Sequence, residues 1–529
     1  MNQIYINKAI GQLLVVGFSG KQITSEVKEL MQRYHVGGII LFSRNLGSPS
    51  EILNLTTDLQ REAKKAGYLY PLLIGVDQEN GMVRRLGEGT TIFPGSMAIG
   101  ATDNASNAYH IGFATGKELL GLGINWNLAP VLDVNNNPDN PVIGIRSFGE
   151  SAEKVAQFGR EAMKGMQDAG IVTTLKHFPG HGDTNVDSHL LLPTISHDLQ
   201  RLEEVELKPF KECIAAGADT IMSAHIYFPA MEPKEGLPAT LSKKIITNLL
   251  REKLGYRGVV TTDCMEMDAI SKTIGTENGA VAAIKAGADI IMISHTFERQ
   301  KGAIEAILNA IDAGALDQDL IVEANKRIQG LKENYLAWGK IKFDNVNVPA
   351  FVGGNEHKAL AKNVYQNSVT IVKNNGLLPL STNQKVLAVY PESRSLVQVE
   401  EEHNMGKNLG ETVREYQSFA TIKQMDDLQS MDQMVQKAKQ YDAVIVGTLT
   451  NSSRSREIIF IKKLIESGVS VVVVAMRNPY VLGYFPEVPA YISTYENSPP
   501  ALEAAAGAIF GKEEAKGRLP VTISGLGYK

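Results

Sequence analysis

Eight short apolar runs restrict the fold of this chain more than any other feature of its sequence. They are rich in β-branched residues and lie at 13–18, 38–42, 72–77, 124–129, 172–177, 220–225, 259–263 and 289–294. Longer stretches between them, such as 50–66 and 202–216, carry apolar residues at helical spacing. Near-continuous apolar strands separated by helices are typical of a parallel sheet covered by helices. Eight regular units favour a closed (β/α)8 TIM barrel over the alternative, an open doubly wound sheet.

A change of pattern near residue 340 predicts a second domain, because 529 residues exceed what one core usually supports. Gly, Asn, Asp and Pro are concentrated at 338–354, which is typical of a linker. A helix-like stretch at 355–366 leads into five further apolar runs, at 369–373, 386–390, 443–447, 469–476 and 490–494. We therefore expect a TIM-barrel domain over 1–340, a linker over 341–365 and a C-terminal αβα sandwich domain over 366–529.

Charge and composition exclude several classes of partner. The formal net charge is −5 and no block of Lys or Arg forms a basic stripe, which argues against nucleic acid as a partner. No apolar run approaches the roughly 18 residues needed to cross a membrane. The first residues lack the basic and apolar regions of a signal peptide, and two cysteines, Cys213 and Cys264, are too few for a disulfide framework. We expect a cytoplasmic protein, and the sequence does not predict its oligomeric state.

Four of the predicted strands end in ionisable residues: Asp77, the pair Lys176 and His177, His225, and Asp263. One polar strand end carries little information, because strands usually stop at polar residues. In a (β/α)8 barrel, however, the carboxyl ends of all strands meet at the catalytic face. The sequence therefore predicts that these side chains gather at one mouth of the barrel.

The segment 176–189 follows one of these strand ends and is rich in loop-forming residues. It holds three of the ten histidines of the chain. Asp187 and His189 are two residues apart, so they point the same way in an extended stretch, and a carboxylate beside an imidazole can orient it and stabilise its charged form. A loop held together by its own Asp–His hydrogen bonds is an equal alternative. Zinc binding by His177, His181, Asp187 and His189 is less favoured, because they lack a compact helical His-x3-His spacing.

Asp263 ends the strongly apolar run at 259–263 and precedes a helix-like stretch. Aspartate is a favoured helix N-cap, and this alone would account for it. A carboxylate at the mouth of a barrel can also attack the anomeric carbon of a sugar and form a glycosyl-enzyme. The residues themselves leave both interpretations open.

The stretch Lys-His-Phe-Pro-Gly-His-Gly at 176–182, followed by Asp-Ser-His at 187–189, resembles the signature of the β-N-acetylglucosaminidase branch of glycoside hydrolase family 3. Other motifs follow in that family's order at 77–79, 84–85, 129–134, 146–149, 238–242 and 262–263. The second domain is similar to the family's C-terminal domain at 368–374 and 378–380. The resemblance covers nearly the whole chain.

This resemblance implies the roles of eight residues. It makes Asp263 the nucleophile, His189 the general acid/base and Asp187 the partner of His189. It implies that a terminal N-acetylglucosamine is held by Asp77, Arg85, Arg146, Lys176 and His177. It implies no metal ion and no other cofactor.

The implied activity is that of a retaining exo-β-N-acetylglucosaminidase, which removes terminal N-acetylglucosamine by double displacement through a covalent glycosyl-aspartate. Peptidoglycan-derived fragments are the expected substrates, and chitin-derived saccharides are an alternative. A histidine acid/base is neutral after losing its proton and would repel phosphate less than a carboxylate, so a phosphorylase is a second reading. A β-glucosidase of the same family and a degenerate sugar-binding protein are two further alternatives for the function.

Overall fold

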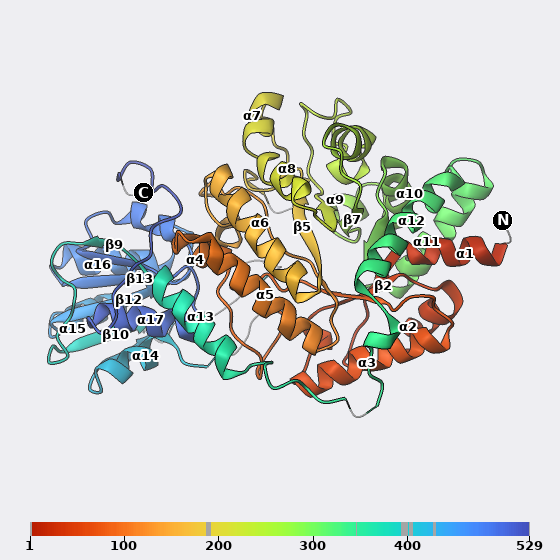
Figure 1. The fold of residues 1–529 in the computed structure, drawn as a ribbon. Coiled ribbons are helices and arrows are strands. Elements are labelled where there is room, and N and C mark those ends of the chain that lie inside the picture. Colours follow the sequence, from red (N-terminus) through yellow and green to blue (C-terminus); the bar gives the residue numbers. More distant parts are fainter. Residues whose placement is uncertain are drawn as a thin grey trace.

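The computed structural model describes residues 3–186, 192–344, 346–392, 400, 406–426 and 430–527. Figure 1 shows a larger part, coloured red to green, beside a smaller blue part that is formed by the end of the chain. The two ends of the chain lie at opposite sides of the molecule. The larger part carries the eight apolar runs of the N-terminal half.

The eight predicted strands form a closed parallel barrel in chain order, and β8 pairs back with β1, so the expected fold class is confirmed. The strand β4 is confined to two residues instead of the expected 124–129. The backbone still bonds the neighbouring strand on either side of this pair, with Asn125 N donating to Ile74 O (3.1 Å) and Leu128 N donating to Val76 O (2.9 Å). The strands are β1 (Leu14–Val16), β2 (Gly38–Leu41), β3 (Leu73–Val76), β4 (Trp126–Asn127), β5 (Val172–Phe178), β6 (Thr220–Ser223), β7 (Val259–Cys264) and β8 (Ile290–Ile293).

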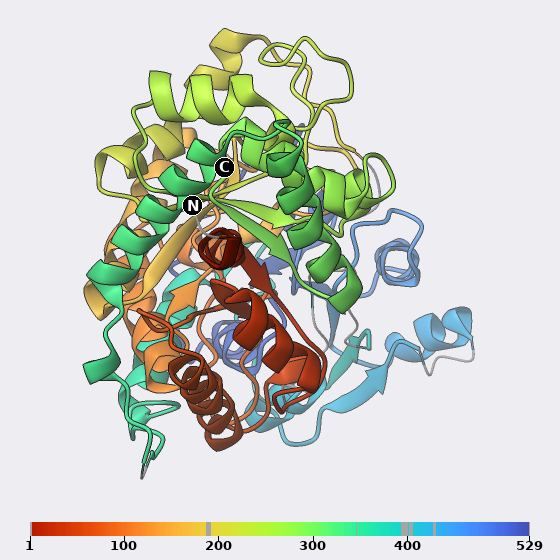
Figure 2. The same ribbon diagram turned by 90° about the vertical axis from the view of Figure 1, so that its right-hand side faces the viewer.

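Helices surround these strands, as Figure 2 shows from the barrel side of the molecule. Helix α3 (Pro49–Lys65) begins at a capping box. Ser48 Oγ accepts a hydrogen bond from Glu51 N, and the Glu51 carboxylate accepts one from Ser48 N (2.7 Å), which fixes where the helix begins. The helices are α1 (Gln3–Gln12), α2 (Ser25–Glu29), α3 (Pro49–Lys65), α4 (Ser96–Ala101), α5 (Ala105–Gly121), α6 (Ala152–Ala169), α7 (Leu199–Glu204), α8 (Lys208–Ala215), η5 (Lys244–Lys253), α9 (Asp268–Ser271), α10 (Thr276–Ala286), α11 (Phe297–Asp312) and α12 (Gln318–Tyr335).

The second domain is a six-stranded sheet between two layers of helices. Its strand order is β11-β10-β12-β13-β14-β9, and only β9 is antiparallel to its neighbour. Ala443 and Ile445 belong to the apolar core that contains residues of α14 and α17, whereas Val444 and Val446 belong to the core shared with α15 and α16. The helices are α14 (Leu409–Tyr416), α15 (Met431–Ala438), α16 (Arg456–Glu466) and α17 (Pro499–Ile509).

The sheet contains one strand that the sequence did not predict. Its strands are β9 (Thr370–Asn374), β10 (Val386–Tyr390), β11 (Thr421–Gln424), β12 (Ala443–Thr448), β13 (Val471–Ala475) and β14 (Ala490–Ser493). The unpredicted strand, β11, lies at the edge of the sheet and reads Thr-Ile-Lys-Gln, with only one strongly apolar residue. An edge strand that is largely polar lacks the continuous apolar pattern by which the others were recognised.

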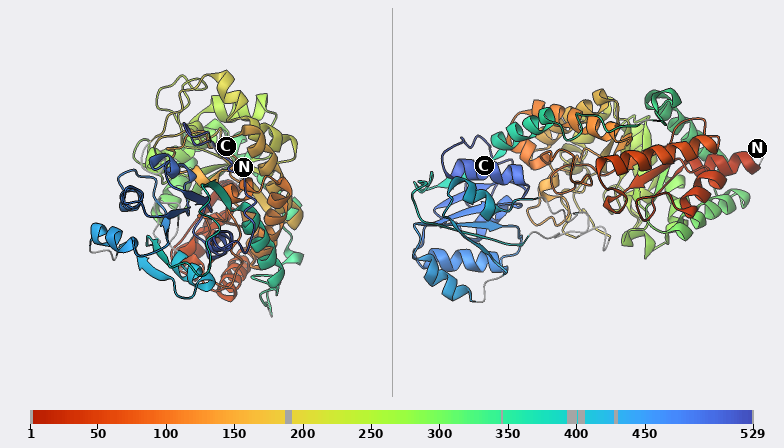
Figure 3. Two further views of the ribbon diagram at one scale, coloured as in Figure 1. Left: turned by 90° about the vertical axis from the view of Figure 1, so that its left-hand side faces the viewer. Right: turned by 90° about the horizontal axis from the view of Figure 1, so that it is seen from below.

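Helix α13 (Asn355–Ser368) connects the two domains and lies within their interface. It packs against α4 and α5 of the barrel and α17 of the second domain, and Figure 3 shows it from below. The buried carboxylate of Glu496 accepts hydrogen bonds from Gly95 N (3.0 Å) in the barrel domain and from Tyr365 Oη (2.9 Å) on α13. Polar contacts thus supplement the apolar packing between the domains.

Within the described ranges, we find no helix that combines the length and the apolar character required to span a membrane.

Candidate active site

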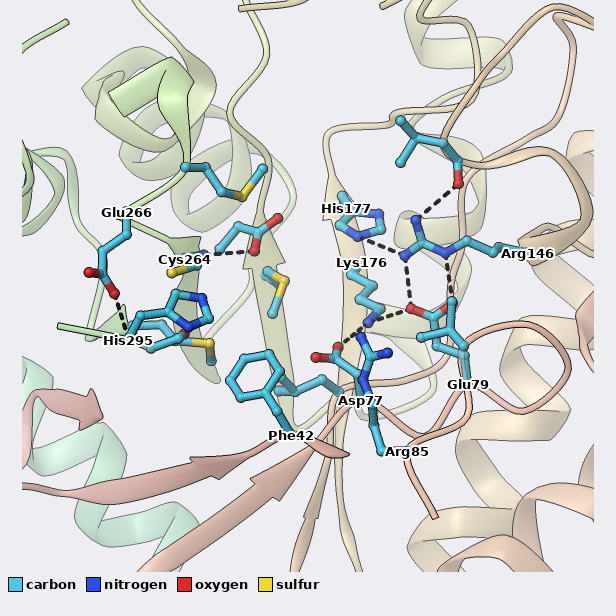
Figure 4. A pocket seen from close by; sticks show the side chains of 18 of the residues that line it. Phe42, Asp77, Glu79, Arg85, Arg146, Lys176, His177, Cys264, Glu266 and His295 are labelled. Carbon is cyan, nitrogen blue, oxygen red and sulfur yellow. Dashed lines mark hydrogen bonds and ion pairs between the residues drawn. The ribbon is translucent and has the colours of Figure 1, made fainter. Parts of the chain in front are cut away.

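A pocket of about 590 Å³ lies where the barrel strands end, and Figure 4 shows it from close by. All of its lining residues in the described part of the chain fall between 42 and 295, so they belong to the barrel domain. Two predicted site residues, Asp187 and His189, lie outside the described residues. The pocket brings together the other six: Asp77, Arg85, Arg146, Lys176, His177 and Asp263.

One side of the pocket is built from a buried ion-pair cluster, on the right in Figure 4. Lys176 Nζ lies 2.6 Å from Asp77 Oδ1 and 2.6 Å from Glu79 Oε1. The Arg146 guanidinium makes a bidentate contact with Glu79 through Nε and Nη2, both at 2.8 Å. Glu79 therefore bridges the two cations and holds both in one geometry.

The charges of this cluster stabilise one another. Burial by itself would raise the pKa of the Glu79 carboxyl, but Arg146 and Lys176 outweigh burial and hold that pKa well below its usual range. Burial would lower the pKa of Lys176, yet Asp77 and Glu79 raise it. Burial is likewise outweighed at Arg146, whose pKa is raised mainly by Glu79. Glu79, Arg146 and Lys176 are thus ionised at neutral pH.

A second buried carboxylate, Asp133, holds the loop that follows β5. Its Oδ2 lies 2.7 Å from His177 Nδ1, and its Oδ1 accepts from His181 N (2.7 Å). Burial opposes ionisation of Asp133, but the charge and hydrogen bond of His177 lower its pKa. The other ring nitrogen of His177 faces Arg146 Nη2 at 3.4 Å. The imidazole is therefore fixed from both sides where it lines the pocket.

The loop approaches its neighbours so closely that one position requires glycine. A Cβ atom at Gly182 would lie 1.7 Å from the carbonyl oxygen of Val134. Asn140 Nδ2 donates to the carbonyls of His181 and Gly182, both at 2.9 Å. The same side chain accepts through Oδ1 from the amide of Val142. This asparagine therefore ties the loop to the segment that leads into the turn bearing Arg146.

Asp263 occupies the end of β7, and its Oδ1 accepts from Cys264 N (2.7 Å). The next helix, α9, begins at Asp268 and has Met267 at its N-cap position. The alternative that Asp263 is simply the N-cap of the following helix is therefore wrong. Its carboxylate is only partly buried and lines the same pocket as the ion-pair cluster.

The positions of three polar residues differ from what the sequence predicts. His225, a predicted strand-end residue, does not line the pocket and contacts Thr240 Oγ1 (2.9 Å) and the carbonyl of Cys264 (3.1 Å). Glu79 and Asp133 were not singled out from the sequence although they shape the site. For Glu79 a signal existed, because it lies two residues after Asp77 and can face the same side. For Asp133 the signal was its place within the motif at 129–134 that the chain shares with the family.

This arrangement suits a neutral, hydroxyl-rich ligand. Carboxylate oxygens accept from hydroxyl groups and the ammonium and guanidinium groups donate to them, each as a charge-assisted hydrogen bond. Because the charges are largely paired within the cluster, binding does not require a ligand of opposite charge. A partly buried carboxylate across the pocket then offers a nucleophile or a base.

His181 should make the protein sensitive to acid. The ring is fully buried, and burial together with the nearby His177 lowers its pKa to about 4 from 6.5. Between these values only the unfolded chain binds the proton, so stability falls as the pH decreases from about 6.5 to about 4, by about 3 kcal/mol in total. Chemical denaturation at a series of pH values should show this loss. His181→Gln should remove this loss of stability, whereas His110→Gln, at an exposed histidine, should retain it. If the free energy of unfolding of His181→Gln still fell equally between these pH values, His181 would not be the group responsible.

Comparison with known proteins identifies the family. Residues 5–331 match the N-terminal domain of glycosyl hydrolase family 3, and residues 369–525 match its C-terminal domain. The chain is 32% identical to β-hexosaminidase A of Pseudoalteromonas piscicida, with 94% of this chain and 91% of the relative covered. A solved family 3 β-N-acetylglucosaminidase from Paenibacillus sp. FPU-7 is 40% identical, covers 98% of both chains and has a TM-score of 0.90. A fungal multi-domain family 3 β-N-acetylglucosaminidase is 38% identical over 98% of this chain and 61% of its own, with a TM-score of 0.92. The chain therefore belongs to glycoside hydrolase family 3, as its motifs predicted.

Proposed function

We propose that this protein is a retaining exo-β-N-acetylhexosaminidase that releases terminal N-acetylglucosamine from small saccharides. The observation that carries the proposal is that Asp263 and the ion-pair cluster of Asp77, Glu79, Arg146 and Lys176 line one pocket at the mouth of the barrel. The similarity to β-hexosaminidases over nearly the full chain supports the choice of an acetamido sugar.

The proposed reaction is a double displacement. Asp263 attacks the anomeric carbon and the glycosidic C–O bond breaks, while His189 gives its proton to the leaving oxygen. A water molecule then attacks the same carbon and gives a proton to His189, and the bond to Asp263 breaks to release the sugar. Asp187 would orient His189 and stabilise its charged form. Both steps invert the anomeric carbon, so the overall configuration is retained.

The ion-pair cluster would hold the sugar ring during both steps. Asp77 lines the pocket with its side chain 20% exposed, so it can accept from a sugar hydroxyl while Lys176 donates to one. Arg85, Arg146 and His177 complete the predicted set of contacts around the terminal sugar. The acetamido group would serve for recognition and not as the nucleophile.

For the natural substrate we propose peptidoglycan-derived fragments that end in N-acetylglucosamine, processed in the cytoplasm. Chitin-derived saccharides are the alternative class. The location and the substrate source are predictions from the sequence alone, and assays of muropeptides against chito-oligosaccharides would separate the two sources.

The proposal predicts a strong preference for the acetamido sugar. We expect kcat/KM for an aryl β-N-acetylglucosaminide to exceed that for the matching aryl β-glucoside by at least about 10²-fold, because a site that hydrogen-bonds a substrate group rejects the analogue lacking it. Initial rates on both substrates, with and without phosphate, measure this. Equal or better hydrolysis of the glucoside would contradict the proposal, and a sugar phosphate as the main product would replace hydrolysis by phosphorolysis.

A further inference from the structure

The pocket wall across from the ion-pair cluster carries three side chains of a different kind. Cys264 follows Asp263 at the end of β7, Glu266 lies two residues further, and His295 follows β8. Figure 4 shows these three together on the left, away from Lys176. One ligand atom from each, the cysteine sulfur, a carboxylate oxygen and a ring nitrogen, all lie within 4.8 Å of one another. All three residues line the pocket.

Hydrogen bonds and packing contacts fix the geometry of this group. The Glu266 carboxylate accepts from His295 N (2.6 Å) and Thr296 N (3.1 Å), so it joins the loop after β7 to the loop after β8. Its side chain is only 5% exposed, with Arg299 Nη1 at 3.6 Å. The His295 ring packs against Phe42, with centroids 5.3 Å apart, and is accessible from solvent. The cluster is therefore held in place and is reachable through the pocket.

We propose that Cys264, Glu266 and His295 form a site for a soft divalent cation, with zinc as the best fit, and that occupancy of this site inhibits the enzyme. A thiolate, an imidazole and a carboxylate are the three ligand types that zinc prefers, whereas magnesium and calcium select oxygen ligands alone. Tetrahedral zinc needs ligand atoms roughly 3.3–3.8 Å apart, given its bond lengths of about 2.0–2.3 Å. Small side-chain rotations would close the present spacing, and water would fill the fourth position.

Zinc at this position would disturb the neighbouring carboxylate. Binding replaces the proton of the Cys264 thiol, which is released to solvent, and places a dication on the side chain that directly follows Asp263 in the sequence. The positive charge would attract the Asp263 carboxylate and reduce its capacity to attack carbon. The bound ion would also occupy space within the pocket that holds the sugar. Both effects predict inhibition, in contrast to a catalytic metal, whose removal would abolish activity.

Zinc chloride is the probe for the first experiment, with hydrolysis of an aryl β-N-acetylglucosaminide as the readout; this arm rests on the proposed function. We expect inhibition at micromolar zinc that EDTA reverses. Cys264→Ser and, independently, His295→Gln should each raise the zinc concentration for half-inhibition by at least tenfold, since loss of a direct ligand should cost no less than the 10- to 100-fold typical of supporting residues. Cys213→Ser is the matched control, because Cys213 is fully buried outside the pocket and should leave the inhibition unchanged.

Cobalt chloride provides a second readout that does not depend on activity. Tetrahedral cobalt bound to a thiolate gives an intense sulfur-to-metal absorption band in the near ultraviolet, so the band should appear in the unmodified protein and in Cys213→Ser and be absent in Cys264→Ser. Its presence in a protein without glycosidase activity would support the metal site while the proposed function failed. Equal zinc inhibition in Cys264→Ser, or a cobalt–thiolate band that is lost only with Cys213, would overturn the inference.

Discussion

Asp263→Ala is expected to lower kcat for an aryl β-N-acetylglucosaminide by on the order of 10⁴-fold or more, because it removes the group proposed to form the covalent intermediate. The side chain is partly buried at the end of β7, where its Oδ1 accepts a hydrogen bond from Cys264 N. Truncation should therefore affect the chemistry much more than the fold. Initial rates measure the loss, and the thermal unfolding midpoint should change little.

Added azide distinguishes the loss of a nucleophile from a general disturbance of the site. In Asp263→Ala the space left by the carboxylate would admit azide, which should restore turnover and give the α-glycosyl azide by a single inversion. Asp268→Asn is the matched control, because this carboxylate also lines the pocket but pairs with Lys272 (2.7 Å), and kcat should change less than tenfold. A variant that retains hydrolysis and gives no azide product would instead favour assistance by the acetamido group.

The barrel could be predicted from the sequence because its strands are buried on both faces and appear as continuous apolar runs. The strand β11 could not, since it lies at a sheet edge and its polar residues follow no such pattern. Likewise, Asp77, Lys176 and Asp263 were predicted as strand-end residues, whereas Asp133 was not. Its importance comes from contacts with His177 and His181, more than 40 positions away in sequence, and such pairing depends on the closed barrel.

The bridging carboxylate Glu79 is expected to be as important for activity as the residues that were predicted to contact the sugar. In Glu79→Gln, the buried Lys176 and Arg146 lose a shared anionic partner, and kcat/KM should fall by on the order of 10²-fold or more, because small displacements of positioning groups carry costs of that size. The free energy of unfolding should decrease by about 3 kcal/mol, as expected for breaking a buried ion pair. Steady-state kinetics and chemical denaturation measure the two effects separately.

Asp289→Asn tests whether the loss of activity follows from stability alone. Asp289 is also fully buried and also bridges two cations, Arg251 Nη2 (2.6 Å) and Arg327 Nε (2.8 Å), but it precedes β8 at the opposite end of the barrel from the pocket. Its substitution should cost comparable stability and leave kcat/KM of the folded enzyme unchanged. If both variants lost activity in proportion to stability, Glu79 would be a structural residue only. A loss of activity confined to Glu79→Gln would show that this buried pairing holds Lys176 and Arg146 in the geometry that the sugar requires.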